Sequence, residues 1–368
     1  MVVARLGPCP PSPAHTMPSS PLPVADDASR QAARQAGLVY LCDTAPGIGR
    51  RRAGRGFVYR DADGARITDT ATLARIRALA IPPAWRDVWI CARPNGHLQA
   101  TGRDVRGRKQ YRYHPDWSSH RGSGKFERIV AFGEALPALR RRLRRDLGLR
   151  GHPRDKVLAI VVAVMDETLL RVGNVTYLRD NQSYGLTTLR NRHIAFVRDG
   201  RAQLRFRGKS GQWHDAVIDD RRLVAAIRRV RELPGQSLFQ YRDDDGQVVP
   251  VDSTAVNAYL HEVLGEDFTA KDFRTWGGTL AAIRALRAHP PAEGPTVLRR
   301  VQAAVAREVA DCLGNTPAVC RSAYIDPVVF EGWREGRLQR FCTDCRGERQ
   351  WERAALAFLR RAHRQRGR

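Results

Sequence analysis

The amino-acid sequence predicts an α+β protein, with a small β-rich N-terminal domain followed by a mainly helical domain that contains a three-stranded antiparallel sheet. Three observations support this fold class. Two β-hairpin signals fall within residues 29–120. Apolar residues recur at helical spacing through most of residues 121–330. Inside that helical stretch, three short strand-like runs follow one another with glycine-containing turns between them.

Residues 1–28 are expected to form a flexible tail. The segment carries seven prolines and few large apolar side chains, so it cannot bury enough surface to offset the entropy of ordering. Met17 lies within this segment and is a second candidate start of translation.

Residues 29–120 are expected to form the β-rich domain. The turn sequence Asp61–Gly64 separates two strand-like runs, and Pro94-Asn95-Gly96 separates a second pair. Glycines begin the basic segment Gly47–Arg52, but the lysine and hydroxyl residue that end a phosphate-binding loop are missing, so we expect a basic loop that touches nucleic acid. The predicted helices and strands of this domain are Ser29–Ala36, Thr70–Ala80, Val88–Ala92 and His97–Thr101.

Residues 121–330 are expected to form the helical domain, after a linker near residues 115–125 that would act as a hinge. The predicted helices are Phe126–Leu147, Asp155–Val172, Asp220–Leu233, Thr254–Leu264, Trp276–Ala288 and Pro295–Leu313. The predicted strands are Arg192–Val197, Gln203–Phe206 and Trp213–Ile218. Residues 331–368 form a basic C-terminal extension with a predicted helix at Trp351–Arg364.

The charge of the chain points to a polyanionic partner. The formal net charge is +25 and the sequence pI is about 10.9, and nucleic acid is the usual partner of so basic a protein. The alternative is a general basic bias with no ligand. Almost all the positive charge comes from arginine, which cannot give up its proton at neutral pH, so a retained lysine is a candidate proton donor. The lysines are Lys109, Lys125, Lys156, Lys209 and Lys271.

Cysteine usage and hydropathy bear on the compartment. The seven cysteines are odd in number and scattered, and no secretory signal precedes them, so we expect free thiols in the cytoplasm, with the protein associated with the nucleoid. The longest strongly apolar run, Val157–Met165, is too short to span a bilayer, so no membrane role is expected. Cys342 and Cys345 have zinc-knuckle spacing but no second pair, and His363 alone is a poor third ligand, so we expect no metal site.

Lys209 lies in Gly208-Lys209-Ser210-Gly211, between two predicted strands. The flanking glycines predict an exposed hairpin tip that can enter a groove, and the alternative is a solvated turn lysine. Arg171 closes a strongly apolar predicted helix, and a nearly buried arginine needs an anion, either a ligand or a carboxylate such as Asp166 or Glu167.

Arg274 lies in Lys271-Asp272-Phe273-Arg274-Thr275-Trp276. If Asp272 caps the following helix, Arg274 stands in the first turn, where the positive helix end would add to its attraction for phosphate. The alternative is a surface arginine on an amphipathic helix. Tyr324 follows Gly314-Asn315-Thr316-Pro317 by a few residues, and a single tyrosine is more often a packing residue than a nucleophile.

The order of these residues along the chain resembles that of the type IB DNA topoisomerases, specifically the compact poxvirus-like enzymes found in bacteria. The resemblance covers about residues 30–330. It implies that Arg171, Lys209 and Arg274 stabilise the transition state and that Tyr324 attacks DNA to form a 3′-phosphotyrosyl link. Asn315 stands where histidine is common in that family, and asparagine can donate a hydrogen bond to a phosphate oxygen but cannot titrate.

The resemblance also implies a partner and a DNA-facing surface. The partner is double-stranded DNA, which a monomer would clamp between its two domains, and no cofactor, metal or ATP is needed. The residues expected to contact DNA are Arg103, Lys109, Gln110, Tyr111, Tyr113 and Lys271. For Lys109–Tyr113, the alternative is an edge strand with ordinary aromatic packing.

Two other functions remain in view. A tyrosine recombinase shares the arginine, lysine and tyrosine chemistry, but such proteins usually carry histidine three residues before the second arginine, where this chain has Lys271. A non-catalytic DNA-binding protein would need the basic charge but not the ordered set of five residues.

Overall fold

The computed structural model describes residues 27–54, 56–105, 107–265, 268–291, 294–341 and 345–366. It divides into two compact units, residues 1–121 and 122–368, which we call the N-terminal and C-terminal units. The predicted tail, residues 1–28, lies almost entirely outside the described residues. Helix α3 (Pro115–Leu147) contains the boundary between the units, so residues 115–125, expected to be a linker, are helical instead.

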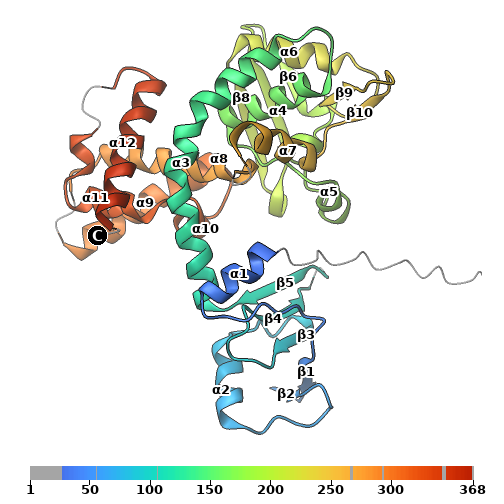
Figure 1. The fold of residues 1–368 in the computed structure, drawn as a ribbon, viewed down its shortest axis with the longest axis vertical. Coiled ribbons are helices and arrows are strands. Elements are labelled where there is room, and N and C mark those ends of the chain that lie inside the picture. Colours follow the sequence, from blue (N-terminus) through green and yellow to red (C-terminus); the bar gives the residue numbers. More distant parts are fainter. Residues whose placement is uncertain are drawn as a thin grey trace, which may run out of the picture. The chain divides into compact units, whose positions relative to one another are not determined.

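The N-terminal unit contains a five-stranded sheet of order β2-β1-β3-β4-β5 (Figure 1). Its elements are α1 (Asp27–Gln35), β1 (Gly47–Ala53), β2 (Gly56–Arg60), α2 (Thr70–Ala78), β3 (Arg86–Cys91), β4 (Leu98–Arg103) and β5 (Lys109–Tyr113). All the strand pairings are antiparallel. A small core of Ile48, Ile76, Val88, Ile90 and Ala100 joins α2 to the sheet. This unit therefore has the predicted β-rich character.

The segment Gly47–Arg52 was expected to be a basic loop, and that expectation is wrong. It forms most of β1, which pairs with both β2 and β3. Ile48 is its buried member, so a single apolar residue among arginines is enough to place the strand in the sheet. Gly47 is required there, because a Cβ at this position would lie 2.2 Å from the indole nitrogen of Trp89.

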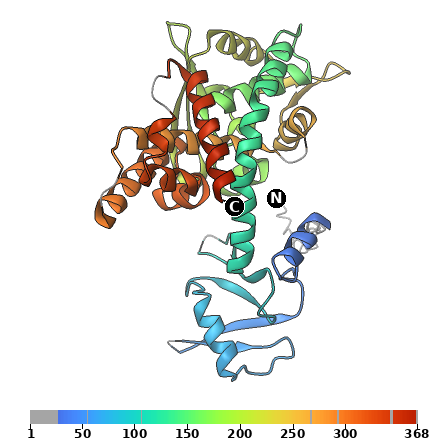
Figure 2. The same cartoon turned by 60° about the vertical axis from the view of Figure 1, so that its left-hand side comes forward.

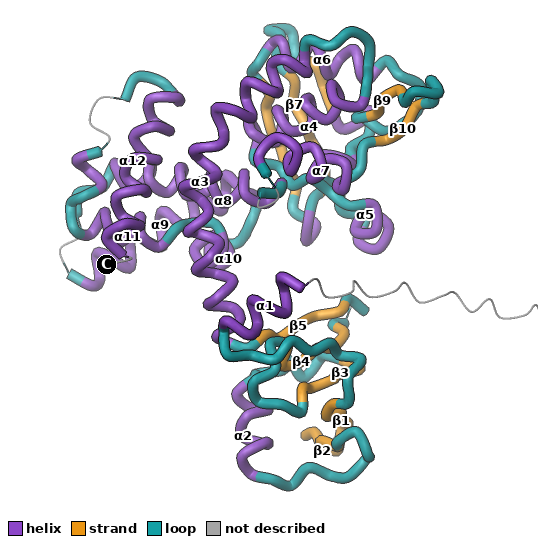
Figure 3. The backbone as a smooth tube through the Cα atoms, in the orientation of Figure 1, coloured by secondary structure: helices purple, strands orange, loops and turns teal. Residues whose placement is uncertain are grey.

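The C-terminal unit is mainly helical, with two small antiparallel sheets (Figure 3). Its helices are α3, α4 (Arg154–Thr168), α5 (Val175–Asn181), α6 (Arg221–Arg231), α7 (Ser253–Leu264), α8 (Ala270–Arg287), α9 (Pro295–Leu313), α10 (Pro317–Ala323), α11 (Pro327–Arg334) and α12 (Glu348–Arg366). Its strands are β6 (Ile194–Phe196), β7 (Ala202–Arg207), β8 (Trp213–Ile218), β9 (Gln240–Arg242) and β10 (Val248–Pro250). Short 3-10 turns occupy Leu186–Thr188, Asn191–His193, Lys209–Gly211 and Leu338–Arg340.

Helix α4 is the centre of this unit. Almost every residue from Val157 to Met165 is fully buried, because the helix is apolar on all sides and is covered by α6, α7, α8 and β8. The helix stops at Thr168, four residues earlier than expected, because Leu169 takes a left-handed conformation at φ 55° and ends the hydrogen-bond ladder. Arg171 therefore lies in the loop after the helix and not in its last turn.

The three-stranded sheet predicted inside the helical domain is present, in the order β6-β7-β8. Its inward residues Leu204, Phe206 and Ile218 belong to the main core, and the alternation of buried and exposed residues along β7 follows the period of a strand. The turn between β7 and β8 carries Lys209, as the sequence predicts.

The described residues after 330, 331–341 and 345–366, are folded into this unit (Figures 1 and 2). Trp351, Phe358 and Leu359 of α12 are at most 5% exposed and belong to the same core as α4. Cys342, one half of the possible metal pair, lies outside the described residues.

Candidate active site

A cleft of about 300 Å³ in the C-terminal unit brings together residues that are far apart in the sequence. Arg171, Lys209, Arg274 and Tyr324 all line it, and Lys271 lies on its wall. These side chains come from the loop after α4, the β7–β8 turn, α8 and the end of α10. The cleft thus contains four of the five residues that the sequence predicts for the reaction.

The backbone of Arg171 is held by pairing with the 3-10 turn that follows α5. The N–H groups of Leu186 and Thr187 donate to the carbonyls of Arg171 and Val172, at 2.9 and 2.7 Å. Gly185 allows this approach, because a Cβ there would lie 2.8 Å from the Arg171 carbonyl. The pairing fixes the direction in which the Arg171 side chain leaves the loop.

Neither Asp166 nor Glu167 neutralises Arg171, contrary to one of the alternatives. Asp166 pairs with Arg140, and Glu167 accepts the backbone N–H of Asp219. The Arg171 guanidinium instead donates to the side-chain oxygen of Asn315 at 2.5 Å. The charge of Arg171 is therefore not cancelled by either acid.

Arg274 is buried, so the alternative of a surface arginine is wrong: only 3% of the residue is exposed. The capping expectation also needs correction. Thr269 is the N-cap of α8, and Asp272 is the third helical residue, which accepts the Thr269 N–H in a capping box. Arg274 consequently lies beyond the first turn of the helix.

The Arg274 side chain binds the ends of two helices, α4 and α9, at the site. Its guanidinium donates to the carbonyl of Leu169 at 2.5 Å and to that of Leu313 at 2.8 Å. The same guanidinium lies 5.2 Å from the centre of the Tyr324 ring. Arg274 thus orders the loop before Arg171 and the loop before Asn315 while facing the tyrosine.

Tyr324 ends α10 and lies against α8. A Cβ added to Gly278 would be 2.8 Å from the Tyr324 carbonyl and 3.1 Å from its Cβ, so this glycine sets how closely the tyrosine approaches. Burial by itself raises the pKa of Tyr324. The charge of Arg274, a hydrogen bond from Arg274, and the charges of Arg171 and Lys271 outweigh burial and lower the pKa below that of a free phenol.

Three buried hydrogen-bond donors on the predicted site residues have no acceptor among the residues that the structure describes. They are Nη1 of Arg171, Nε of Arg274 and Nδ2 of Asn315. Leaving one buried donor unpaired costs about 1–3 kcal/mol, and more when the group is charged. Three such donors, two of them cationic, form a ready site for an anion with several oxygen acceptors.

Lys209 is exposed at the tip of the β7–β8 turn, and its ammonium group lies 5.8 Å from the ring centre of Tyr177. Ser210 takes a left-handed conformation at φ 62°, and Gly211 follows at φ 77°, so the turn needs the small residues that the sequence supplies. Lys209 of this hairpin and Lys271 of α8 both line the cleft.

His214 is a neighbour of the site that the sequence did not single out. Its ring lies between Gly208 and Gly314, and a Cβ on either glycine would come within 2.5 Å of it. Burial, and then the charges of Arg171 and Arg274, lower the pKa of His214 to about 4, so the ring is neutral at physiological pH. Only the three-dimensional packing reveals that His214 separates the lysine hairpin from the Asn315 loop.

The remaining predicted DNA contacts lie in the N-terminal unit, on β4 and β5. Strand β5 is an edge strand, and Tyr111 and Tyr113 stack on each other while 48% and 45% exposed. Lys109 pairs with Asp43, and Gln110 donates to Asp104 at 3.0 Å. Arg103 is exposed and donates to the carbonyl of Gly107.

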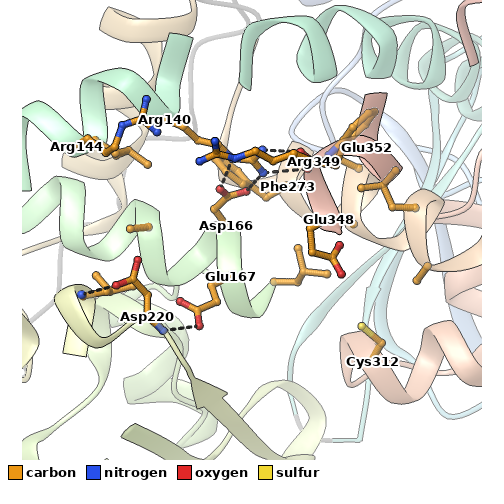
Figure 4. A pocket seen from close by; sticks show the side chains of 18 of the residues that line it. Arg140, Arg144, Asp166, Glu167, Asp220, Phe273, Cys312, Glu348, Arg349 and Glu352 are labelled. Atoms are coloured by element: carbon orange, nitrogen blue, oxygen red, sulfur yellow. Dashed lines mark hydrogen bonds and ion pairs between the residues drawn. The ribbon is translucent and has the colours of Figure 1, made fainter. Parts of the chain in front are cut away.

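A larger cavity, of about 660 Å³, lies between α3, α4, α8 and α12 (Figure 4). Its lining contains none of the residues predicted for the reaction. In the described part of the chain, no group of three or more histidine, cysteine or acidic side chains is placed to hold a metal ion. No helix among the same residues is long and apolar enough to cross a membrane.

Comparisons with known proteins identify related families for both units of the chain. Residues 114–330 match the family described as eukaryotic DNA topoisomerase I, catalytic core, and residues 56–104 match the family described as bacterial DNA topoisomerase IB, N-terminal domain. The first match spans all the residues that line the cleft.

Viral proteins are among the relatives. DNA topoisomerase 1B of Acanthamoeba polyphaga mimivirus is 34% identical over 287 residues, which cover 76% of this chain and 85% of the viral protein. DNA topoisomerase 1 of Rabbit fibroma virus (strain Kasza) is 25% identical, and DNA topoisomerase 1B of Vaccinia virus (strain Copenhagen) is 20% identical, each over 62% of this chain and 70% of its own length. These matches favour a topoisomerase over a tyrosine recombinase, and the chain belongs to the type IB DNA topoisomerase family.

Proposed function

We propose that this enzyme relaxes supercoiled DNA through a covalent bond to Tyr324, with Arg171, Arg274 and Asn315 holding the scissile phosphate and Lys209 protonating the departing oxygen. The observation that carries the proposal is the set of three unpaired buried donors, on Arg171, on Arg274 and on the Asn315 that contacts Arg171. The two arginines line the cleft with Tyr324, and none of the described residues on its wall is a carboxylate. A phosphodiester supplies the oxygen acceptors that these donors lack.

The reaction follows from the chemistry of these groups. The Tyr324 oxygen, whose proton passes to solvent, attacks phosphorus while the bond from phosphorus to the 5′ oxygen breaks. The two arginines and Asn315 stabilise the charge that builds up on the phosphoryl oxygens. Lys209 gives a proton to the 5′ oxygen, so a 5′ hydroxyl and a 3′-phosphotyrosyl link result. The free 5′ end rotates, and the reverse reaction reseals the strand with no need for ATP, because the link keeps the energy of the phosphodiester.

The wider setting of this chemistry is also part of the proposal. A monomer would clamp duplex DNA, with the exposed β5 tyrosines and Lys271 among the contacts, and would work in the cytoplasm at the nucleoid. The net charge of +25 supports tight, salt-sensitive contact with phosphates.

The proposal is tested by locating the residue that carries the DNA. Purified protein is incubated with a nicked duplex from which the short fragment that bears the new 5′ hydroxyl diffuses away, and the trapped adduct is digested and sequenced by mass spectrometry. We expect the nucleotide on Tyr324. Tyr177 and Tyr184 also line the cleft and serve as internal controls, and DNA on either of them would refute the assignment.

Replacing Asn315 by alanine should slow cleavage by roughly one to three orders of magnitude, the scale of one lost oxyanion donor. The variant loses the unpaired Nδ2 donor and also the oxygen that holds Arg171. Single-turnover cleavage at saturating protein measures the effect. Asn315→His should recover much of the rate, because its ring can donate a similar bond, whereas a wild-type rate for the alanine variant would make Asn315 a turn residue only.

Gly278→Ala should slow cleavage by roughly a hundredfold, the effect of moving a reacting group by about 1 Å. The new methyl group meets the Tyr324 backbone, which cannot move aside without moving the nucleophile. Arg284→Ala is the control on the same helix, since its exposed side chain bonds to Glu348 and does not line the cleft. Equal slowing in the two variants would show that the defect lies in the helix and not in the placement of Tyr324.

A further inference from the structure

Helix α12 lies outside both family matches, which end at residues 104 and 330, yet it is built into the catalytic unit. One face of the helix is buried: Trp351, Ala355, Phe358, Leu359 and Ala362. Gly332 of α11 permits close contact, because a Cβ there would lie 2.5 Å from the Phe358 ring. The extension is therefore held by a continuous apolar contact with α11, the helix that follows the nucleophile.

Ionic bonds fix the start of the same helix. Arg140 of α3 lies between Asp166 of α4 and Glu352 of α12, at 2.8 and 2.5 Å (Figure 4). Glu352 also accepts from the Trp276 indole at 3.4 Å. These bonds set the position of α12 along its axis, and with it the position of residues one to three turns further on.

His363, near the end of α12, makes a polar contact with the nucleophile segment. Its Nε2 lies 2.7 Å from Oδ2 of Asp326, which is fully buried. The other carboxylate oxygen accepts the N–H of Val328 at 3.0 Å, so Asp326 is also the N-cap of α11. Because a buried carboxylate must be hydrogen-bonded, the contact with His363 restricts the conformation of the Asp326 side chain.

Asp326 is joined in turn to Tyr324 through a buried hydroxyl. The Asp326 N–H donates to Oγ1 of Thr279 at 3.2 Å, and the Thr279 hydroxyl donates to the Tyr324 carbonyl at 3.2 Å. Thr279 is fully buried and is the neighbour of Gly278 on α8. A connected set of hydrogen bonds thus runs from α12 to the backbone of the tyrosine.

We propose that His363 is a positioning residue for Tyr324, acting through Asp326 and Thr279, so that the C-terminal extension sets the attack geometry of the nucleophile. The proposal rests on the assignment of Tyr324 as the nucleophile. His363 does not touch DNA or the reacting atoms in this scheme. Replacing His363 by alanine removes the donor to Oδ2 of the buried Asp326 carboxylate. We expect Asp326 to regain a hydrogen bond by a shift of the segment that carries Tyr324.

The test is single-turnover cleavage of a nicked duplex at saturating protein, at a temperature well below the unfolding midpoint of each variant. We expect His363→Ala to cleave roughly ten to a hundred times more slowly, as for a small misplacement of a reacting group. His363→Gln should recover most of the rate, since its amide nitrogen can donate to Asp326 in place of Nε2. Arg360→Ala is the matched control, because it removes only the exposed α12 contact with Glu134.

The outcomes separate this proposal from the assignment on which it rests. If wild-type protein forms no adduct, or forms it on another tyrosine, the assignment of Tyr324 fails. If wild-type protein cleaves through Tyr324 and His363→Ala is equally fast, or if Arg360→Ala and His363→Ala are equally slow, the positioning role is wrong. If His363→Ala does not fold, Thr279→Val tests the proposal in its place, because it removes the bridging hydroxyl at nearly constant volume. A wild-type cleavage rate in Thr279→Val would overturn the proposal. Slow cleavage that Thr279→Ser restores would support it.

Discussion

Tyr324→Phe should abolish relaxation of supercoiled plasmid, with a loss on the order of a millionfold, the scale seen when a nucleophile is removed. Only the attacking oxygen is lost, while the arginines that bind phosphate and the exposed tyrosines of β5 remain. The affinity for duplex DNA should therefore stay nearly unchanged. Gel assays in EDTA without ATP measure relaxation, and filter binding measures affinity.

Tyr177→Phe is the matched control for this result. Tyr177 lines the same cleft and also carries a phenol, but it lies beside Lys209 and not beside Arg274. The control should retain relaxation. Residual relaxation by Tyr324→Phe, together with its loss in Tyr177→Phe, would exchange the roles of the two tyrosines.

Lys209→Ala should cleave ordinary DNA about a hundred to ten thousand times more slowly, the range for loss of a general acid. An alkoxide is a poor leaving group, so the 5′ oxygen must gain a proton as its bond to phosphorus breaks. Arginine holds its proton too tightly for this task, and Lys209 lines the cleft from the β7–β8 turn.

A sulfur atom in place of the bridging 5′ oxygen distinguishes proton donation from charge stabilisation. A thiolate leaves without protonation, because the pKa of a thiol is far below that of an alcohol. On this substrate Lys209→Ala should cleave at close to the wild-type rate, whereas Arg171→Ala should remain slow. If sulfur does not rescue Lys209→Ala, the lysine acts as a phosphate-binding charge, and Arg171 becomes the first candidate for the acid.

The local sequence predicted the bounds of an element correctly where the apolar pattern and the capping residues indicate the same ends. Helix α9 has the predicted bounds, with Pro295 at its start and Gly314 after its end. The hairpin around Lys209 was predicted from the glycines that its turn requires. Helix α8 was predicted six residues too short at its start. The choice of Asp272 as the cap, where the structure uses Thr269, accounts for three of those residues, because Asp272 is both a good cap and a good third residue.

The sequence by itself determined the fold class, the order of the candidate residues and the excess of positive charge, since these depend on local patterning and composition. The tertiary structure alone decided that Arg274 is buried and that Arg171 faces Asn315 in place of Asp166 or Glu167. It also decided that His214 packs against Gly208 and Gly314 and that His363 contacts Asp326. Arg171 and Asn315 are 144 positions apart in the chain, and Asp326 and His363 are 37 apart. Such contacts depend on how helices pack across the core, and no periodicity along the chain encodes which partner a buried polar group will meet.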